Sequence, residues 1–120
     1  MTELDHEKLE VYKTSIEFVA LADQIARRLR RGRSYLADQL QRAATSISLN
    51  IAEGAGEFSS GDKARFYRIA KRSATECAAI LDVCRRLDVI DEKQLQTGHD
   101  KIVQIVSMLT RMVRNRSRSK

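Results

Sequence analysis

The sequence contains no proline and no tryptophan, and aromatic residues make up only 5% of it, whereas 42% of its residues are hydrophobic and 32% are charged. This composition is typical of long helices packed in a bundle. No apolar run approaches the roughly 20 residues that cross a bilayer, and the polar start, MTELDHEKLE, excludes the hydrophobic region of a signal peptide. We therefore expect a cytoplasmic protein that has no membrane partner.

Cysteine is also scarce, since Cys77 and Cys84 are the only two in the chain. They lie seven residues apart in one expected helix, so their α-carbons would be about 10 Å apart, which is beyond the reach of a disulfide. We expect both to be reduced residues of the core. A chain of 120 residues is long enough for one domain with a hydrophobic core that needs no such crosslink.

Four segments repeat apolar residues at alternating intervals of four and three, which is the spacing of packed helices. They cover residues 8–31, 34–52, 60–88 and 91–113. Short loops between long helices predict an all-α, antiparallel, up-down-up-down four-helix bundle over residues 1–113. The Arg/Ser-rich residues 114–120 are expected to form a disordered tail.

Helix starts are marked by side chains suited to capping. Ser34 is the expected cap of the second helix, and Ser59 followed by Asp62 resembles a capping box before the third. Asp91 followed by Gln94 gives a similar start to the fourth helix. Each helix should therefore begin at a defined residue.

The stretch 39–54, QLQRAATSISLNIAEG, carries two stripes at helical spacing. The apolar stripe is expected to face the core and consists of Leu36, Leu40, Ala43, Ile47, Ile51 and Gly54. The second stripe is polar and consists of Gln39, Arg42, Ser46, Asn50 and Glu53. Together with Ser73 and Glu76 on the third helix, we call this second set the polar seam.

The polar seam has two interpretations. It is either a ligand or catalytic site, or a hydrogen-bonded network that fixes helix register or subunit contacts. We favour the structural interpretation, because buried charges need partners and a satisfied polar network specifies one packing. Arg42 is then expected to pair with Glu76 or Glu53.

Enzyme chemistry has little support in the sequence. Glu53 and Glu76 are two carboxylates in a predicted bundle, but the Glu-x-x-His pairs of di-iron bundles are absent. His99 falls on the packed face of the fourth helix, with no metal-ligating residue at suitable spacing on that face. No nucleophile–base pair or phosphate-binding glycine pattern occurs, so we expect no catalytic residues, no metal and no cofactor.

Positive charge is gathered at two places in a chain with a net charge of +6. In the predicted bundle, one end carries what we call the first basic pole: Arg27, Arg28, Arg30, Arg31 and Arg33, with Arg85 and Arg86 nearby. The other end carries the second basic pole, near Lys63 and Arg65: Arg111, Arg114, Arg116 and Arg118. Arginine suits phosphate geometry, so both poles are candidates for salt-sensitive contacts to a nucleic-acid backbone.

The second helix closely resembles the signature of the four-helix bundle family that includes proteins encoded within ribosomal RNA intervening sequences. The resemblance is carried by Gln39 to Ile47, QLQRAATSI, by Asn50 to Gly54, NIAEG, and by Phe66, Ala70, Ser73 and Glu76 on the third helix. It extends from about Leu9 to Val113. Two places depart from it, since Arg72 stands where many relatives have glycine, and the glycine loop reads Gly56-Glu57-Phe58 where a basic residue is common.

The resemblance implies a four-helix bundle that assembles into a homopentamer, in a family whose biochemical role is mostly unknown. The accessory protein of diversity-generating retroelements has the same fold, and it is understood to bind a reverse transcriptase and nucleic acid through a basic surface. Two hypotheses follow. The first is a non-enzymatic, oligomeric nucleic-acid-binding protein. The second is an adaptor that binds an acidic protein partner such as a reverse transcriptase.

Overall fold

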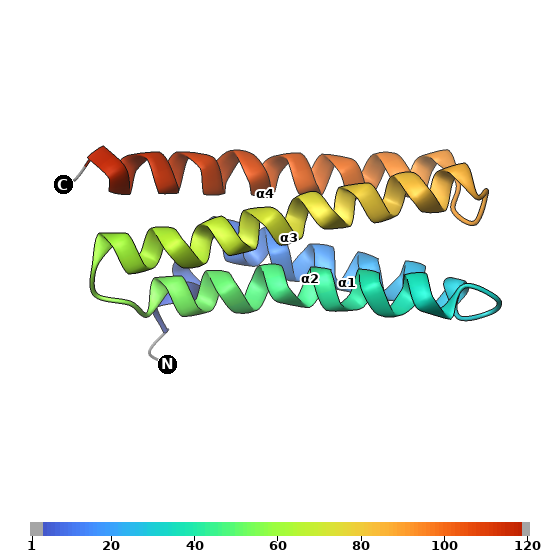
Figure 1. Ribbon diagram of the computed structural model, residues 1–120, viewed down its shortest axis with the longest axis horizontal. Helices are drawn as coiled ribbons and strands as arrows, with labels where there is room; N and C mark the ends of the chain where they lie inside the picture. Colours follow the sequence, from blue (N-terminus) through green and yellow to red (C-terminus); the bar gives the residue numbers. More distant parts are fainter. Residues whose placement is uncertain (1–3, 119–120) are drawn as a thin grey trace.

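The computed structural model describes residues 4–118, with side chains described as far as Asn115. A short 3₁₀ turn precedes four α-helices, and the described residues contain no strand. The elements are η1 (Asp5–Lys8), α1 (Glu10–Leu29), α2 (Ser34–Ala55), α3 (Ser60–Arg86) and α4 (Glu92–Arg118). Figure 1 shows long helices joined by short loops, each running opposite to the next. The predicted all-α four-helix bundle is confirmed.

The core is built from one apolar stripe on each helix. Phe18 and Ile25 on α1 and Leu40 and Ile47 on α2 are fully buried. The whole apolar stripe predicted on α2, from Leu36 to Gly54, is excluded from solvent. These stripes place α1 beside α2, α2 beside α3 and α3 beside α4, and α4 closes the bundle against α1.

The prediction that His99 lies on the packed face of α4 was wrong, because His99 is exposed. Gly98 is buried instead, and a Cβ added to it would lie 2.7 Å from Cδ1 of Leu81 on α3. The missing side chain allows α4 to approach α3 closely at this point. Spacing from Leu95 fits position 98 as well as 99, and a glycine gives no apolar signal in the sequence.

Two of the three predicted caps are present. The Ser59 side chain accepts a hydrogen bond from the Asp62 amide at 3.0 Å. Asp91 and Gln94 form a reciprocal capping box, with contacts of 2.7 and 3.2 Å. Ser34, by contrast, is already helical, and the residue in the cap position is Arg33, which makes no side-chain capping bond.

Helix ends also differ from the prediction. α1 begins at Glu10 and ends at Leu29, whereas α2 continues past Ala52 to Ala55. α4 continues past Val113 to Arg118, into the segment that the sequence predicted to be a disordered tail. The last two residues of the expected tail, 119–120, lie outside the described residues.

The described helices differ from membrane spans. None of the helices within residues 4–118 combines the length and apolar character needed to cross a bilayer.

Candidate nucleic-acid interface

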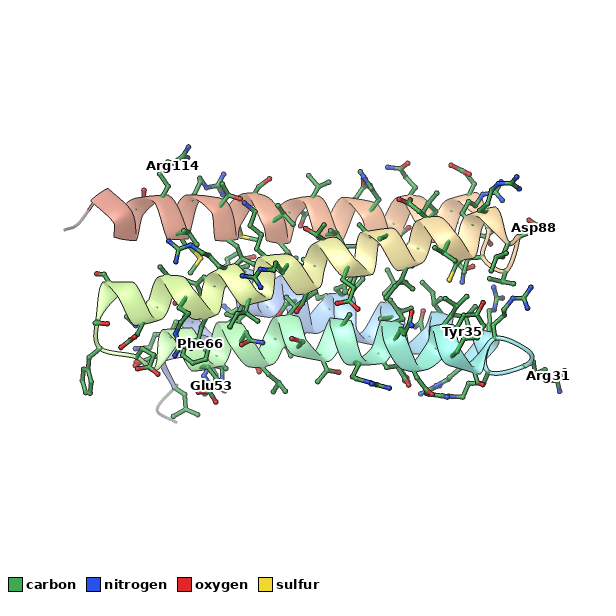
Figure 2. All side chains as sticks on the ribbon, viewed as in Figure 1. Arg31, Tyr35, Glu53, Phe66, Asp88 and Arg114 are labelled. Carbon is green, nitrogen blue, oxygen red and sulfur yellow. The ribbon has the colours of Figure 1, made fainter. Side chains whose placement is uncertain are left out.

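The fold places the two basic poles at opposite ends of the bundle. Figure 2 shows Arg31 on the α1–α2 loop at the end of the bundle where Asp88 lies on the α3–α4 loop. Arg114 lies at the other end, where α2 and α3 are joined and where α4 ends. The two poles therefore form two separate surfaces.

Arginines of the first basic pole are partly neutralised by acidic side chains. Arg27 pairs with Asp23 at 2.9 Å and Arg30 pairs with Asp38 at 3.0 Å. Arg30 also donates a hydrogen bond to the amide oxygen of Gln41. These pairs are exposed, so each contributes little to stability, but each reduces the local positive potential.

Arg85 of the same pole lies between two carboxylates on the α3–α4 loop side. Its guanidinium contacts Glu92 at 3.0 Å and Asp88 at 3.4 Å. The hydrogen bond to Glu92, followed by the charge of Glu92, raises the pKa of Arg85. Three other members of the pole are exposed and have no carboxylate within 4.0 Å among the described side chains: Arg28, Arg31 and Arg86.

Arg33 completes the first basic pole and is half-buried. Its Nη1 donates to the carbonyl of Gly32 at 3.5 Å, while its Nε is buried without a hydrogen-bond partner among the described atoms. Arg33 occupies the position before the first residue of α2, and its half-buried side chain is less accessible than those of the exposed arginines.

The second basic pole includes more basic residues than the sequence analysis assigned to it. Arg111 and Arg114 are exposed on α4, and the side chains of Arg116 and Arg118 lie outside the described set. Beside this half of α4 runs the first half of α3, because the two helices are antiparallel neighbours. That part of α3 adds five more cations: Lys63, Arg65, Arg68, Lys71 and Arg72.

No acidic residue interrupts these two neighbouring segments. Residues 63–75 and 101–118 together contain ten lysines and arginines and no aspartate or glutamate. Three arginines at intervals of three and four share the outer side of α3, and two lie on α4. We call these five exposed residues the cationic face: Arg65, Arg68, Arg72, Arg111 and Arg114.

Partners of the cationic face are few among the described residues. Arg65 lies over the ring of Phe66 at 4.6 Å, and none of the five arginines has a carboxylate within 4.0 Å. The sequence prediction includes Arg65 near this pole but not Arg68 and Arg72, which are distant in sequence from the arginines of α4. The available signal was the absence of acidic residues from two segments that an antiparallel bundle brings together.

Charge is divided unequally between the two halves of the bundle. Residues 1–59 contain eight basic and nine acidic side chains, a net charge of −1. Residues 60–120 contain fourteen basic and seven acidic side chains, a net charge of +7. The whole excess of positive charge therefore belongs to the half of the chain that includes α3 and α4.

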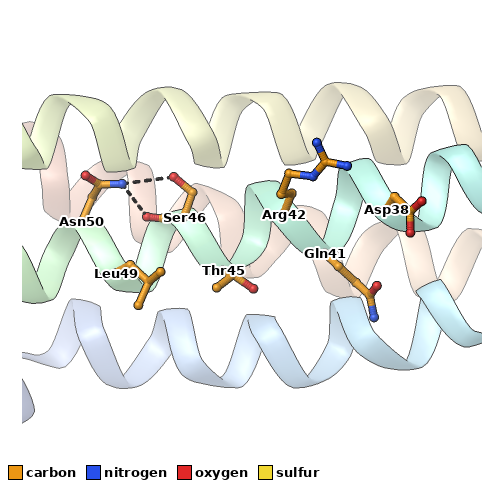
Figure 3. Close-up of a pocket in the computed structure, with 7 residues that line it drawn as sticks. All are labelled: Asp38, Gln41, Arg42, Thr45, Ser46, Leu49 and Asn50. Atoms are coloured by element: carbon orange, nitrogen blue, oxygen red, sulfur yellow. Dashed lines mark hydrogen bonds between the residues drawn. The ribbon is translucent and has the colours of Figure 1, made fainter.

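The polar seam is brought together only in its central part. Ser46 on α2 and Ser73 on α3 share a hydrogen bond of 2.9 Å. The Asn50 amide donates to the Ser46 hydroxyl at 3.1 Å and to the Ser46 carbonyl at 2.9 Å, as Figure 3 shows. The remaining seam residues are exposed: Gln39, Arg42, Glu53 and Glu76.

The expected ion pairs of Arg42 are not formed. Neither Glu76 nor Glu53 lies within 4.0 Å of its guanidinium, although Arg42 and Glu76 line the same shallow depression between α2 and α3. Figure 3 shows the Arg42 side chain extended toward α3 over open surface. An exposed arginine needs no carboxylate partner, which is why the prediction of a buried pair failed.

An open groove of about 510 Å³ follows the outer face of α2 (Figure 3). It is lined by Asp38, Gln41, Arg42, Thr45, Ser46, Leu49 and Asn50. All seven belong to one helix, so the groove has no opposing wall that would enclose a small substrate. Among the described residues, no group of three or more potential metal ligands is close enough to hold an ion.

The cysteines are buried in the bundle and are free thiols. Burial, with a smaller contribution from the charge of Glu76, raises the pKa of the Cys77 thiol from 9.0 to about 12. Burial also raises the pKa of Cys84. Neither thiol is therefore poised to act as a nucleophile near neutral pH.

Comparison with known sequences identifies the family. Residues 7–111 match the sequence profile described as 23S rRNA-intervening sequence protein. The chain belongs to this family. The match covers η1 in part and all of α1 to α3, and it includes α4 as far as Arg111. No curated protein matches the chain.

One solved structure has the same fold as this member of the 23S rRNA-intervening sequence protein family. It is described as a protein of unknown function from the S23 ribosomal protein family of Bacteroides thetaiotaomicron. The two chains share 24% sequence identity with a TM-score of 0.81, over 86% of this chain and 97% of the other. At that identity the likeness supports the four-helix architecture alone.

Proposed function

We propose that this family member is a non-enzymatic, homo-oligomeric protein of the cytoplasm that binds the phosphate backbone of nucleic acid. The observation that carries the proposal is the unequal charge of the two halves, −1 for residues 1–59 and +7 for residues 60–120. A surface of one sign raises the local concentration of a polyanion and speeds its association. Phosphates supply the charge-assisted hydrogen bonds that arginine side chains form best.

Several features support a binding role over catalysis. The groove on the outer face of α2 is open to solvent, and the two thiols are buried with raised pKa values. Binding that depends on backbone phosphates needs neither a metal nor a cofactor. It is sequence-independent and weakens with salt, because each neutralised phosphate releases counterions.

The proposal is tested by fluorescence anisotropy of a structured RNA and of a duplex DNA, each titrated with the protein over a salt series. We expect binding to both that weakens steeply as salt rises from 50 to 200 mM. Polyglutamate serves as a competitor of equal charge but different chemistry. The proposal fails if neither nucleic acid binds near physiological salt.

A protein partner is the second candidate, favoured by the same charge asymmetry. An acidic protein such as a reverse transcriptase would also be attracted to the half of the chain that carries +7. Displacement of bound nucleic acid by an equal charge concentration of polyglutamate would support this alternative. Phosphate recognition predicts that polyglutamate competes poorly, because carboxylates are spaced differently along a flexible chain.

The outer face of α1 and α2 supports self-association. Ile16 and Leu49 are 44% and 61% exposed there, although both side chains are large and apolar. A groove of about 460 Å³ between the helices is lined by small and apolar side chains that include Val19, Ala20 and Ala44. This half of the chain is nearly uncharged in total, so copies that meet through it avoid the repulsion between their positive halves.

Assembly is tested by light scattering after size exclusion, with a homopentamer as the expected state. Ile16→Glu combined with Leu49→Glu should dissociate the oligomer, because both charges would be buried at the contact. Val83→Glu combined with Val103→Glu is the matched control, since these side chains are 44% and 48% exposed on α3 and α4. A monomeric wild-type protein, or an unchanged mass in the variant at Ile16 and Leu49, would contradict this interface.

A further inference from the structure

We infer that the cationic face of α3 and α4, and not the first basic pole, is the phosphate-binding surface, and that it takes a double-stranded backbone. The inference rests on the proposed function and adds to it the location of the site and the form of the nucleic acid. It follows from the contacts of individual arginines, which differ between the two ends of the bundle.

The arrangement of the cationic face suits a run of phosphates. Arg65 and Arg72 lie seven residues apart on the same side of α3, a separation of about 10 Å along the helix, with Arg68 between them. Arg111 and Arg114 lie on the neighbouring antiparallel helix, whose axis would be about 8–10 Å away. Two short rows of exposed arginines are thus carried by two neighbouring helices of the bundle.

The two ends differ in how many of their arginines are free of carboxylates, since among the described side chains only Arg28, Arg31 and Arg86 are exposed and free at the first basic pole. In the first basic pole, a phosphate would compete with the carboxylates that already contact Arg27, Arg30 and Arg85 at 2.9–3.4 Å. On the cationic face all five arginines are exposed and none has a carboxylate within 4.0 Å among the described residues. A phosphate gains the full interaction there without displacing an acidic partner.

Side chains beside the cationic face favour a duplex over a single strand. Proteins that bind single strands stack the bases on exposed aromatic rings. Phe66 is half-buried beneath Arg65, and Tyr67 is buried in the core. The fully exposed Phe58 belongs to the α2–α3 loop and the exposed Tyr35 to α2, so the described side chains of α3 and α4 include no fully exposed aromatic ring.

The test compares two variants that lose the same charge at opposite ends of the bundle. Arg65→Gln, Arg68→Gln and Arg72→Gln together lower the net charge from +6 to +3 at the cationic face. Arg27→Gln, Arg28→Gln and Arg31→Gln together cause the same change at the first basic pole. All six side chains are exposed, so neither variant should disturb the core.

The readout is the slope of log binding constant against log salt concentration, measured by anisotropy with a 20-base-pair DNA duplex, an RNA duplex and one isolated strand. Each phosphate contact contributes about −0.9 to the slope for duplex DNA. Removing three of five contacts should reduce the slope to about two-fifths of the wild-type value. The variant at the first basic pole should keep the wild-type slope, and both duplexes should bind more tightly than the strand.

Different failures have different meanings. Absence of binding by the wild-type protein contradicts the proposed function itself. Binding that is lost only in the variant of the first basic pole overturns the assigned surface and leaves the proposed function standing. Tighter binding to the isolated strand overturns the duplex assignment. A changed oligomer mass in the α3 variant, measured by light scattering, would place these arginines in a subunit contact and also overturn the inference.

Discussion

Ser15 on α1 and Ser48 on α2 share a hydrogen bond of 2.9 Å between hydroxyls that are both buried. The Ser15 hydroxyl also donates to the Tyr12 carbonyl at 2.7 Å. A hydroxyl has a single proton, so Ser48 must be the donor in the bond between the two serines. This polar contact lies inside the otherwise apolar boundary between α1 and α2.

Ser15→Ala should destabilise the protein by about 1 kcal/mol, because the buried Ser48 hydroxyl loses its partner. Ser48→Ala should cost less, because the Ser15 hydroxyl keeps its hydrogen bond to the Tyr12 carbonyl. The double replacement should cost less than the sum of the two single replacements. Urea unfolding followed by circular dichroism, at one fixed protein concentration, gives the three values. Strict additivity would show that the two hydroxyls are not coupled.

Gly54 is expected to be the glycine least tolerant of a methyl group. A Cβ at this position would lie 2.7 Å from Cε1 of Tyr67 and 3.1 Å from Cβ of Phe66. Both contacts come from α3, and the ring of a buried tyrosine has little room to move. Gly54→Ala should therefore destabilise the protein by about 1–3 kcal/mol in urea unfolding, despite the higher helix propensity of alanine.

Gly61 provides the matched control in the first turn of α3. A Cβ there would have no atom within 4 Å. Gly61→Ala should leave stability unchanged or raise it by up to about 1 kcal/mol, because alanine loses less backbone entropy. Equal destabilisation by the two substitutions would contradict the close approach of α2 and α3 at Gly54.

Arg42→Ala should change the free energy of unfolding by less than about 0.5 kcal/mol, since Arg42 is exposed and has no carboxylate within 4.0 Å among the described residues. The measurement is urea unfolding, with the oligomer mass as a second readout. A decrease of more than about 1 kcal/mol in the free energy of unfolding would indicate that Arg42 does form a structural ion pair. Loss of assembly alone would place Arg42 in a subunit contact.

The buried thiols should make stability depend on alkaline pH. The folded state holds the pKa of Cys77 at about 12, whereas an unfolded thiol titrates near 9. Above pH 9 the native state thus binds more protons than the unfolded state, and stability falls as pH rises. The urea midpoint should decrease between pH 8 and pH 10.5, and the decrease should be smaller in a Cys77→Ala, Cys84→Ala variant.

Much of the architecture follows from spacing in the sequence. The apolar stripes of α1 and α2 are buried as predicted, because large side chains at helical spacing leave few ways to pack. Errors arose where the decisive residue gives no apolar signal. Gly98 contributes no side chain, and its role depends on the close approach of Leu81 from another helix. The Ser15–Ser48 contact likewise depends on how α1 and α2 are aligned.

The candidate surface was only half predicted. The arginines of α4 were recognised as one basic pole, but Arg68 and Arg72 were not connected with them. Sequence separation hides this relation, because it arises from the antiparallel placement of α3 beside α4. The partial neutralisation of the first basic pole was equally hidden, since Asp38 meets Arg30 only across the turn between two helices.

The like charges of the cationic face also repel one another in the free protein. Arg68 and Arg72 are four residues apart on one helix, a spacing at which like charges destabilise a helix by a few tenths of a kcal/mol. Dissolved salt screens such repulsion, with a range of about 10 Å at 0.1 M. Moderate salt should thus raise the melting temperature of the protein while it weakens the binding of a polyanion. Rising ionic strength would then stabilise the free protein and weaken its complex with a polyanion. This opposite response is expected when residues that favour binding lower the stability of the fold.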